Sequence, residues 1–96
     1  MLDHRRIKSA ALKRLVKSGD GSKIDAEWRR KVDRLLGQLN VAVHPAELDL
    51  PGNHFHALKG DRVGTYSVTV RRNFRITFKW DSEGPFDVDL EDYHGH

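Results

Sequence analysis

The first 40 residues carry the hydrophobic spacing of α-helices. Apolar residues recur at intervals of three and four positions over 7–16 and again over 24–39, so each segment would present one apolar stripe. Between them, the run 18–22 places two glycines close together, which favours a turn. The pattern therefore predicts two antiparallel helices joined by a short glycine turn, a helical hairpin at about residues 7–40.

The second half of the chain changes to a period of two. Residues 41–62 have no regular pattern and contain Pro45 and Pro51, so they are expected to form a loop. Apolar and polar residues then alternate within residues 63–94, in runs separated by turn-forming residues. These runs cover residues 65–71, 74–80 and 86–91. Helices must cover the apolar face of such an antiparallel β-meander, so the expected architecture is α+β in a single domain, residues 1–96.

Length and composition narrow the class of protein. The chain has 96 residues, enough for one small core, and its lack of cysteine excludes disulfides, thiolate metal sites and a cysteine nucleophile. It has no apolar run of about 18 residues, and the charged start of the chain has no apolar stretch behind it. We therefore expect a cytoplasmic protein with no secretory signal and no membrane partner.

Charge is distributed unevenly along the chain, whose net charge is +3. Residues 1–36 hold eleven basic and five acidic residues, and residues 57–80 hold six basic and one acidic. Residues 81–96 hold six acidic residues and no lysine or arginine. Such a chain can present a basic face to a polyanion, but the acids of the last strand could equally neutralise neighbouring strands.

The polar face of the predicted sheet gathers charged and hydroxyl side chains. Because side chains alternate along a strand, Arg75 should lie opposite the apolar residues, together with Arg71 on the preceding strand. The other residues expected on this face are Thr69, Thr77, Lys79, Asp87, Asp89 and Glu91. Either these acids form cross-strand ion pairs with Arg75 and Lys79 on a solvated surface, or Arg71 and Arg75 hold a phosphate, whose oxygens match a guanidinium fork.

Histidine is frequent, with six in the chain. The pairs His54–His56 and His94–His96 could bind zinc or nickel through their imidazoles. Neither pair has an obvious carboxylate partner at ligand spacing, so a metal site is the weaker interpretation.

His56 and His94 each lie beside other residues that can carry chemistry. Lys59 follows His56 by three positions, and Tyr93 precedes His94. Imidazoles titrate near neutrality and can transfer protons, while fixed cations stabilise the charge of a pentavalent phosphate. RNA supplies its own nucleophile in the 2′-OH, so such a set could cleave RNA without a metal. DNA lacks that hydroxyl and would not react in this way.

Three ordered segments of the second half carry a family resemblance. They are PGNHFHALKGDR (51–62), GTYSVTVRRNFRITF (64–78) and VDLEDYH (88–94). These segments resemble the loop, the central hairpin and the last strand with its final Tyr-His of HigB-type toxins, members of the RelE/ParE superfamily of bacterial toxin–antitoxin systems. Three motifs in consistent order are more specific than any one of them.

The resemblance implies a fold, an activity and partners. The implied fold is the RelE-like one, a small twisted antiparallel sheet packed on two N-terminal helices. The implied activity is that of a type II toxin that acts as a ribosome-dependent mRNA endonuclease and uses no cofactor. The implied partners are a helix-turn-helix antitoxin of the HigA type, the ribosome with its mRNA, and operator DNA through the antitoxin.

Motif position also implies a role for individual residues. The implied catalytic residues are His56, Lys59, Arg75, Tyr93 and His94. The two histidines would transfer protons, the two cations would stabilise the phosphate, and the tyrosine would stack or hydrogen-bond near the scissile nucleotide. Arg71 is implied as a further substrate contact. Attack by the 2′-OH would leave a 2′,3′-cyclic phosphate and a 5′-hydroxyl.

Several alternatives remain open at this point. Related toxins begin with a short apolar strand, whereas residues 2–7 are too charged for a confident one, so an edge strand is missing or degenerate. The basic residues of 29–34 would dock on ribosomal RNA or form an ordinary solvated helix face. A toxin of this fold could also act on DNA gyrase without cleaving RNA, as ParE-type relatives do, or the chain could bind nucleic acid or antitoxin without catalysis.

Overall fold

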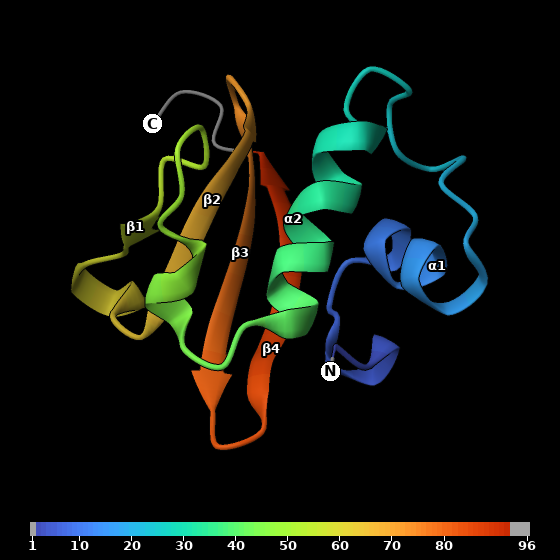
Figure 1. Ribbon diagram of the computed structural model, residues 1–96. Helices are drawn as coiled ribbons and strands as arrows, with labels where there is room; N and C mark the ends of the chain where they lie inside the picture. The colour runs from blue at the N-terminus through green and yellow to red at the C-terminus, as the bar shows by residue number, and fades with distance from the viewer. Residues whose placement is uncertain (1, 93–96) are drawn as a thin grey trace.

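The structure is a computed structural model that describes residues 2–92. Within these residues, two helices cover one face of a four-stranded antiparallel sheet (Figure 1). The helices are α1 (Ala10–Ser18) and α2 (Arg29–Val41), and the strands are β1 (His56–Ala57), β2 (Thr65–Arg71), β3 (Phe74–Asp81) and β4 (Gly84–Asp92), in sheet order β1-β2-β3-β4. Short 3₁₀ turns are η1 (His4–Arg6), η2 (Pro45–Leu48) and η3 (Gly60–Arg62). The predicted α+β class is confirmed.

Both helices begin later than the hydrophobic spacing predicts. α1 starts after Ser9, whose hydroxyl accepts a backbone amide hydrogen at 3.2 Å, and it ends at Gly19 in the left-handed conformation. α2 starts only at Arg29, because the Asp25 carboxylate accepts a backbone amide at 2.9 Å in a turn that competes with helix. Residues 19–28 thus replace the predicted short glycine turn, and Figure 1 shows α1 crossing α2 rather than lying along it.

The hydrophobic core lies between the two helices and the apolar face of the sheet. Its most deeply buried apolar side chains are Leu12, Val32, Leu35, Leu39, Leu48, Val68, Ile76, Phe78 and Val88. All of them except Leu48 belong to the apolar sets that the two periodicities indicated, whereas Leu48 lies in η2, within the region predicted as a loop. No helix within residues 2–92 has the length and apolar content that crossing a bilayer requires.

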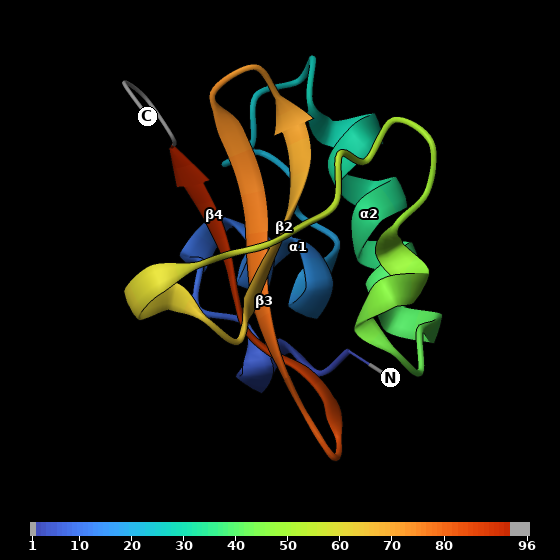
Figure 2. The same cartoon turned by 90° about the vertical axis from the view of Figure 1, so that its left-hand side faces the viewer.

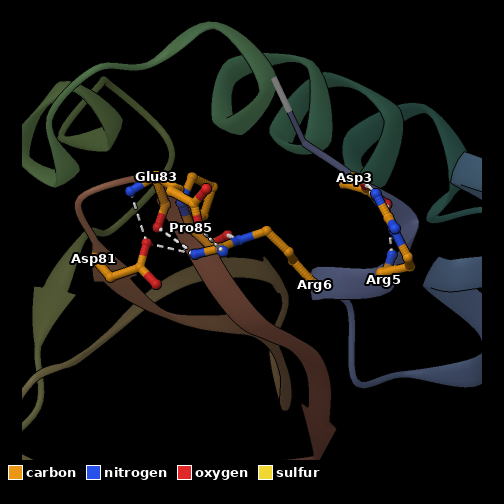
Figure 3. Close-up of polar contacts among 7 residues, drawn as sticks. Asp3, Arg5, Arg6, Asp81, Glu83 and Pro85 are labelled. Carbon is orange, nitrogen blue, oxygen red and sulfur yellow. Dashed lines mark hydrogen bonds and ion pairs between the residues drawn. The ribbon is translucent and has the colours of Figure 1, made fainter.

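The N-terminal segment is fastened to β4 instead of forming a strand. Ile7 makes one parallel β-bridge with Val88, whose carbonyl oxygen accepts the next backbone amide at 2.7 Å. Arg6 reaches the β3–β4 hairpin, where its Nε donates to Pro85 O at 2.8 Å and its Nη2 lies 2.5 Å from Asp81 Oδ1 (Figure 3). The charged sequence predicted that the edge strand would be missing or degenerate. In the structure it is reduced to the single β-bridge of Ile7, which the contacts of Arg6 support.

A β-bulge in β4 changes which face its first residues occupy. Thr77 pairs with Asp89, whereas Lys79 pairs with Phe86, so β4 holds one extra residue in this interval. Within it, Asp87 has a positive φ of 49°. The prediction that Phe86 continues the apolar face of β4 is therefore wrong, because Phe86 shares the face of Lys79.

Strand β1 forms inside the region predicted as a loop. His56 pairs with Ser67 and Ala57 with Tyr66, which adds an edge strand to the predicted meander. A strand of two residues has no detectable alternation, so periodicity could not predict it. Figure 2 shows the segment from β1 to η3 crossing in front of β2 and β3.

Candidate active site on the polar face of the sheet

The loop before β1 is pinned by one buried amide, Asn53. Its side chain is 1% exposed, and its Nδ2 donates to Leu48 O and to Gln38 Oε1, both at 2.8 Å. Its carbonyl oxygen accepts from the Thr69 amide at 2.7 Å, which joins the loop to β2. Because every one of these groups is bonded, the backbone is fixed three residues before His56.

His56 lies at the edge of the sheet with an exposed side chain. Its register partner is Ser67, and the same row continues through Thr77 to Asp89. Its Nδ1 lies 2.8 Å from the carbonyl oxygen of His54. Since a carbonyl can only accept, Nδ1 carries the proton of the neutral ring and Nε2 is left able to accept one.

Arg75 lies in the adjacent row of the same face. It pairs with Thr69 on β2 and Glu91 on β4, and its side chain is half-buried. Thr69 is two residues beyond Ser67, so the two rows project to the same side. The structure therefore brings His56 and Arg75 to one face of the sheet, as the alternation of β3 and the motif position of His56 lead one to expect.

Lys59 lies at the start of η3. Its side chain is exposed, and η3 lies over the polar face of the sheet, where Arg62 contacts Glu91 of β4. Here η3 bounds one side of a cleft of about 420 Å³. The cleft walls include Lys8, Arg62, Thr77, Lys79, Asp89 and Glu91.

Ion pairs link the walls of this cleft. Arg62 donates through Nη1 and Nη2 to the two carboxylate oxygens of Glu91, at 2.9 and 2.7 Å, and the Thr77 hydroxyl also donates to that carboxylate. The hydrogen bond from Arg62 lowers the pKa of Glu91 below its ordinary value, while partial burial opposes this shift. Lys79 Nζ lies 3.8 Å from Asp87, which confirms one of the predicted cross-strand pairs.

Arg71 does not share this face, contrary to prediction. Thr69 pairs with Arg75 but Arg71 pairs with Phe74, so β2 holds one extra residue in this interval, and the β-bulge turns Arg71 to the side of Phe74. There its Nη1 lies 2.6 Å from Glu27 Oε2, and its guanidinium lies 6.0 Å from the ring centre of Trp28. The expectation that Arg71 and Arg75 point the same way is wrong, and a substrate contact by Arg71 stays a prediction.

Two of the expected site residues, Tyr93 and His94, lie outside the described residues. The last described residue, Asp92, pairs with Phe74, which is the neighbour of Arg75 on β3. Strand β4 therefore ends beside the part of β3 that carries Arg75.

The outer face of α2 is less uniformly basic than the sequence suggests. Arg30 and Arg34 are exposed, as expected for a surface that meets a polyanion. Lys31 is half-buried instead, its Nζ donates to Gly52 O at 2.8 Å, and burial lowers its pKa. The prediction of an exposed cation at this position is wrong.

The weaker interpretation of the histidines was that they bind a metal ion. In the part of the chain that the structure describes, no three histidine, aspartate or glutamate side chains gather to hold a metal ion. The pair His54–His56 is included in that part, whereas His94–His96 is not. No described residue is therefore assigned as a metal ligand.

Sequence reasoning assigned no role to Asn53, Arg62 or Glu91 in shaping the site. The turn-forming Pro51-Gly52 before Asn53 was the available signal for an anchored loop. Arg62 and Glu91 are 29 residues apart, so only the folded chain brings them together.

Comparison with known proteins agrees with the motifs. The family model described as RelE-like toxin of the type II toxin–antitoxin system HigB matches residues 5–94. A relative in Proteus vulgaris, named Endoribonuclease HigB, is 36% identical over 87 residues, which cover 91% of this chain and 95% of the relative. Since both matches extend over the helices, the site loop and the sheet, this chain belongs to the HigB family of RelE-like toxins of type II toxin–antitoxin systems.

Proposed function

We propose that this toxin is an endoribonuclease that cleaves mRNA on the ribosome. The observation that carries the proposal is the placement of His56 and Arg75 on one face of the sheet, in a chain 36% identical to a protein named as an endoribonuclease. A proton-transfer group and a fixed cation on one face are what cleavage of a phosphodiester requires.

The chemistry follows from these side chains and from the substrate itself. The 2′-OH attacks the adjacent phosphate as it loses its proton to a base, and the 5′-oxygen leaves as it gains a proton from an acid. His56 and His94 are the two proton-transfer groups, Lys59 and Arg75 hold the non-bridging oxygens, and Tyr93 stacks or hydrogen-bonds near the scissile nucleotide. The products are a 2′,3′-cyclic phosphate and a 5′-hydroxyl, and none of these steps requires a metal ion.

The exposure of the site supports dependence on the ribosome. Within residues 2–92, the side chains of His56 and Lys59 are both exposed and are not enclosed by the protein. Because correct placement of the reacting groups supplies a large part of catalysis, an external scaffold for the mRNA would supply what this site lacks. The exposed Arg30 and Arg34 on α2 would contact ribosomal RNA phosphates.

The partners of this chain are proposed from its membership of the family. A type II toxin acts with a protein antitoxin, and we propose a helix-turn-helix antitoxin of the HigA type, through which the complex contacts operator DNA. The proposed substrate places the active toxin in the cytoplasm, where ribosomes translate mRNA.

The test is to induce the chain in bacteria and map the 5′ ends of translated messages. Wild-type protein is expected to produce cuts inside reading frames, in phase with codons. Arg75→Ala should lower the cleavage rate by about 100-fold, the size of effect seen when a charge-stabilising group is removed from an active site. Arg72→Ala, an exposed arginine in the adjacent turn, is the matched control and should cleave normally.

Other outcomes would replace the proposal. Growth arrest without such cuts would indicate a non-cleaving target, such as DNA gyrase. A folded product that causes no arrest would indicate a binding module. Equal loss of cleavage in Arg72→Ala and Arg75→Ala would show that the effect is one of general charge and not of the site.

A further inference from the structure

The short turn η3 is placed over the polar face without apolar packing of its own. None of its three residues is buried; it begins at Gly60, at φ 68°, and Gly64 follows it at φ 95°, conformations that glycine adopts without strain. Apolar burial therefore does not fix its position, and polar contacts must do so.

One such contact spans from η3 to the far strand of the sheet. Arg62 holds Glu91 of β4 with both terminal guanidinium nitrogens, at 2.9 and 2.7 Å, in the fork geometry that fixes orientation as well as distance. The Thr77 hydroxyl on β3 donates to the same carboxylate. The Glu91 carboxylate is thus fixed between its own strand, β4, and β3, and the Arg62 guanidinium joins it to η3.

The charges around this carboxylate keep it ionised at neutral pH. Hydrogen bonding from Arg62 is the main cause of its lowered pKa, Thr77 and Lys8 act in the same direction, and partial burial opposes them. Arg75 faces Glu91 in the strand register. The other charged groups lining the cleft are Asp61, Lys79, Asp87 and Asp89.

We infer that Arg62 and Glu91 are positioning residues for the cleavage reaction. β1 pairing holds His56 at the start of the segment 56–62, and the Arg62–Glu91 ion pair holds its other end, η3, next to Lys59. Because Glu91 is the register partner of Arg75, the same pair sets the distance from that segment to the third candidate catalytic residue. The inference rests on the proposed function, since it concerns the geometry of that site.

The first measurement is cleavage of mRNA on programmed ribosomes with purified toxin in excess. Glu91→Gln and Arg62→Ala should each lower the maximal rate by about 10-fold, because small displacements of reacting groups cost one to two orders of magnitude. The toxin concentration at half-maximal rate should not change, since neither residue is assigned to ribosome binding. The double variant should be no slower than either single variant, because both remove the same pair.

The matched control is Asp87→Asn. Asp87 is a carboxylate on the same strand and in the same cleft, but it pairs with Lys79 and not with η3. It should cleave at the wild-type rate. Reductions in rate for Arg62→Ala and Glu91→Gln that simply add in the double variant, or that Asp87→Asn reproduces, would overturn the inference.

A second measurement does not depend on activity. Amide hydrogen exchange of residues 58–63 should be faster in Arg62→Ala and in Glu91→Gln than in wild type, while exchange in β3 stays unchanged. Unaltered exchange there would overturn the inference even if the rates fell. Wild-type toxin that does not cleave mRNA on ribosomes would instead overturn the proposed function, and hydrogen exchange would still report whether the pair holds the loop.

Discussion

At the scale of single residues, Ser67 allows a direct test of how the hydrogen bonding of the polar face affects stability. It is fully buried between His56 and Thr77 in the sheet register, and its Oγ has no hydrogen-bond partner among the described residues. A buried hydroxyl without a partner is costly, so Ser67→Ala should raise the free energy of unfolding by about 1 kcal/mol. Denaturant titration with an unchanged m-value would measure the gain.

Thr77 provides the contrast for that prediction. It is equally buried on the same face, but its hydroxyl donates to Glu91. Thr77→Val removes a hydrogen bond to a charged group and should lower the free energy of unfolding by about 1–2 kcal/mol. A loss of stability in Ser67→Ala as well would show that its hydroxyl is bonded in solution.

The face of the sheet on which a residue lies could be predicted only where apolar and polar residues alternate along the strand without interruption. Arg75 was placed correctly because β3 keeps a strict period of two through its apolar partners Ile76 and Phe78. Arg71 was placed on the wrong face because one extra residue in β2 reverses everything beyond it, and no residue type marks that bulge. Family motifs named His56 and Lys59, whereas the anchoring role of Asn53 becomes evident only from its buried contacts.

At the scale of elements, Arg6 replaces an edge strand. Its side chain is 22% exposed and bonds to Pro85 O and Asp81 of the β3–β4 hairpin (Figure 3). Its guanidinium also lies 5.5 Å from the ring centre of Phe86. Arg6→Ala should lower the free energy of unfolding by about 2 kcal/mol, since it removes charged hydrogen bonds from a partly buried site. The amides of Lys8 and Ser9, which donate to β4, should also exchange faster.

Arg5 is the natural control for this prediction. It precedes Arg6 in η1, is 80% exposed, and pairs with Asp3 only two residues away (Figure 3). Exposed local pairs contribute little, so Arg5→Ala should leave both the stability and the exchange of β4 unchanged. Equal effects of the two variants would mean that the N-terminal segment is held by net charge and not by the hairpin contacts.

Secondary-structure elements were predicted correctly where residues close together in the sequence determine them. The β2–β3 turn came out at Arg72-Asn73 as predicted, because turn residues there separate two alternating runs. The late start of α2 and the strand β1 were not predicted. The first depends on a local turn at Asp25 that competes with the helix and that hydrophobic spacing does not reveal. The second depends on a tertiary contact, pairing with a strand farther along the chain.

At the scale of the whole molecule, the uneven charge of the chain serves two purposes. Acidic residues of 81–92 are used internally: Asp81 and Glu83 at the β3–β4 hairpin lie close to Arg6, and Asp87 and Glu91 on β4 lie close to Lys79 and Arg62. This is the neutralisation of neighbours that the charge pattern offered as one interpretation. It leaves the exposed arginines of α2 on a separate surface, where the other interpretation, a basic face toward a polyanion, still applies.

That separation gives a prediction for binding to the ribosome. Arg30→Gln with Arg34→Gln should weaken binding several-fold at low salt and reduce the slope of log affinity against log salt by about 2, because each arginine that neutralises a phosphate releases about one counterion. Lys13→Gln with Arg14→Gln on α1 makes the same change of net charge and is the control. Affinity measured across a range of salt concentrations distinguishes the two cases. If both double variants reduce the slope equally, the toxin is attracted by its overall charge, and α2 is an ordinary solvated helix face.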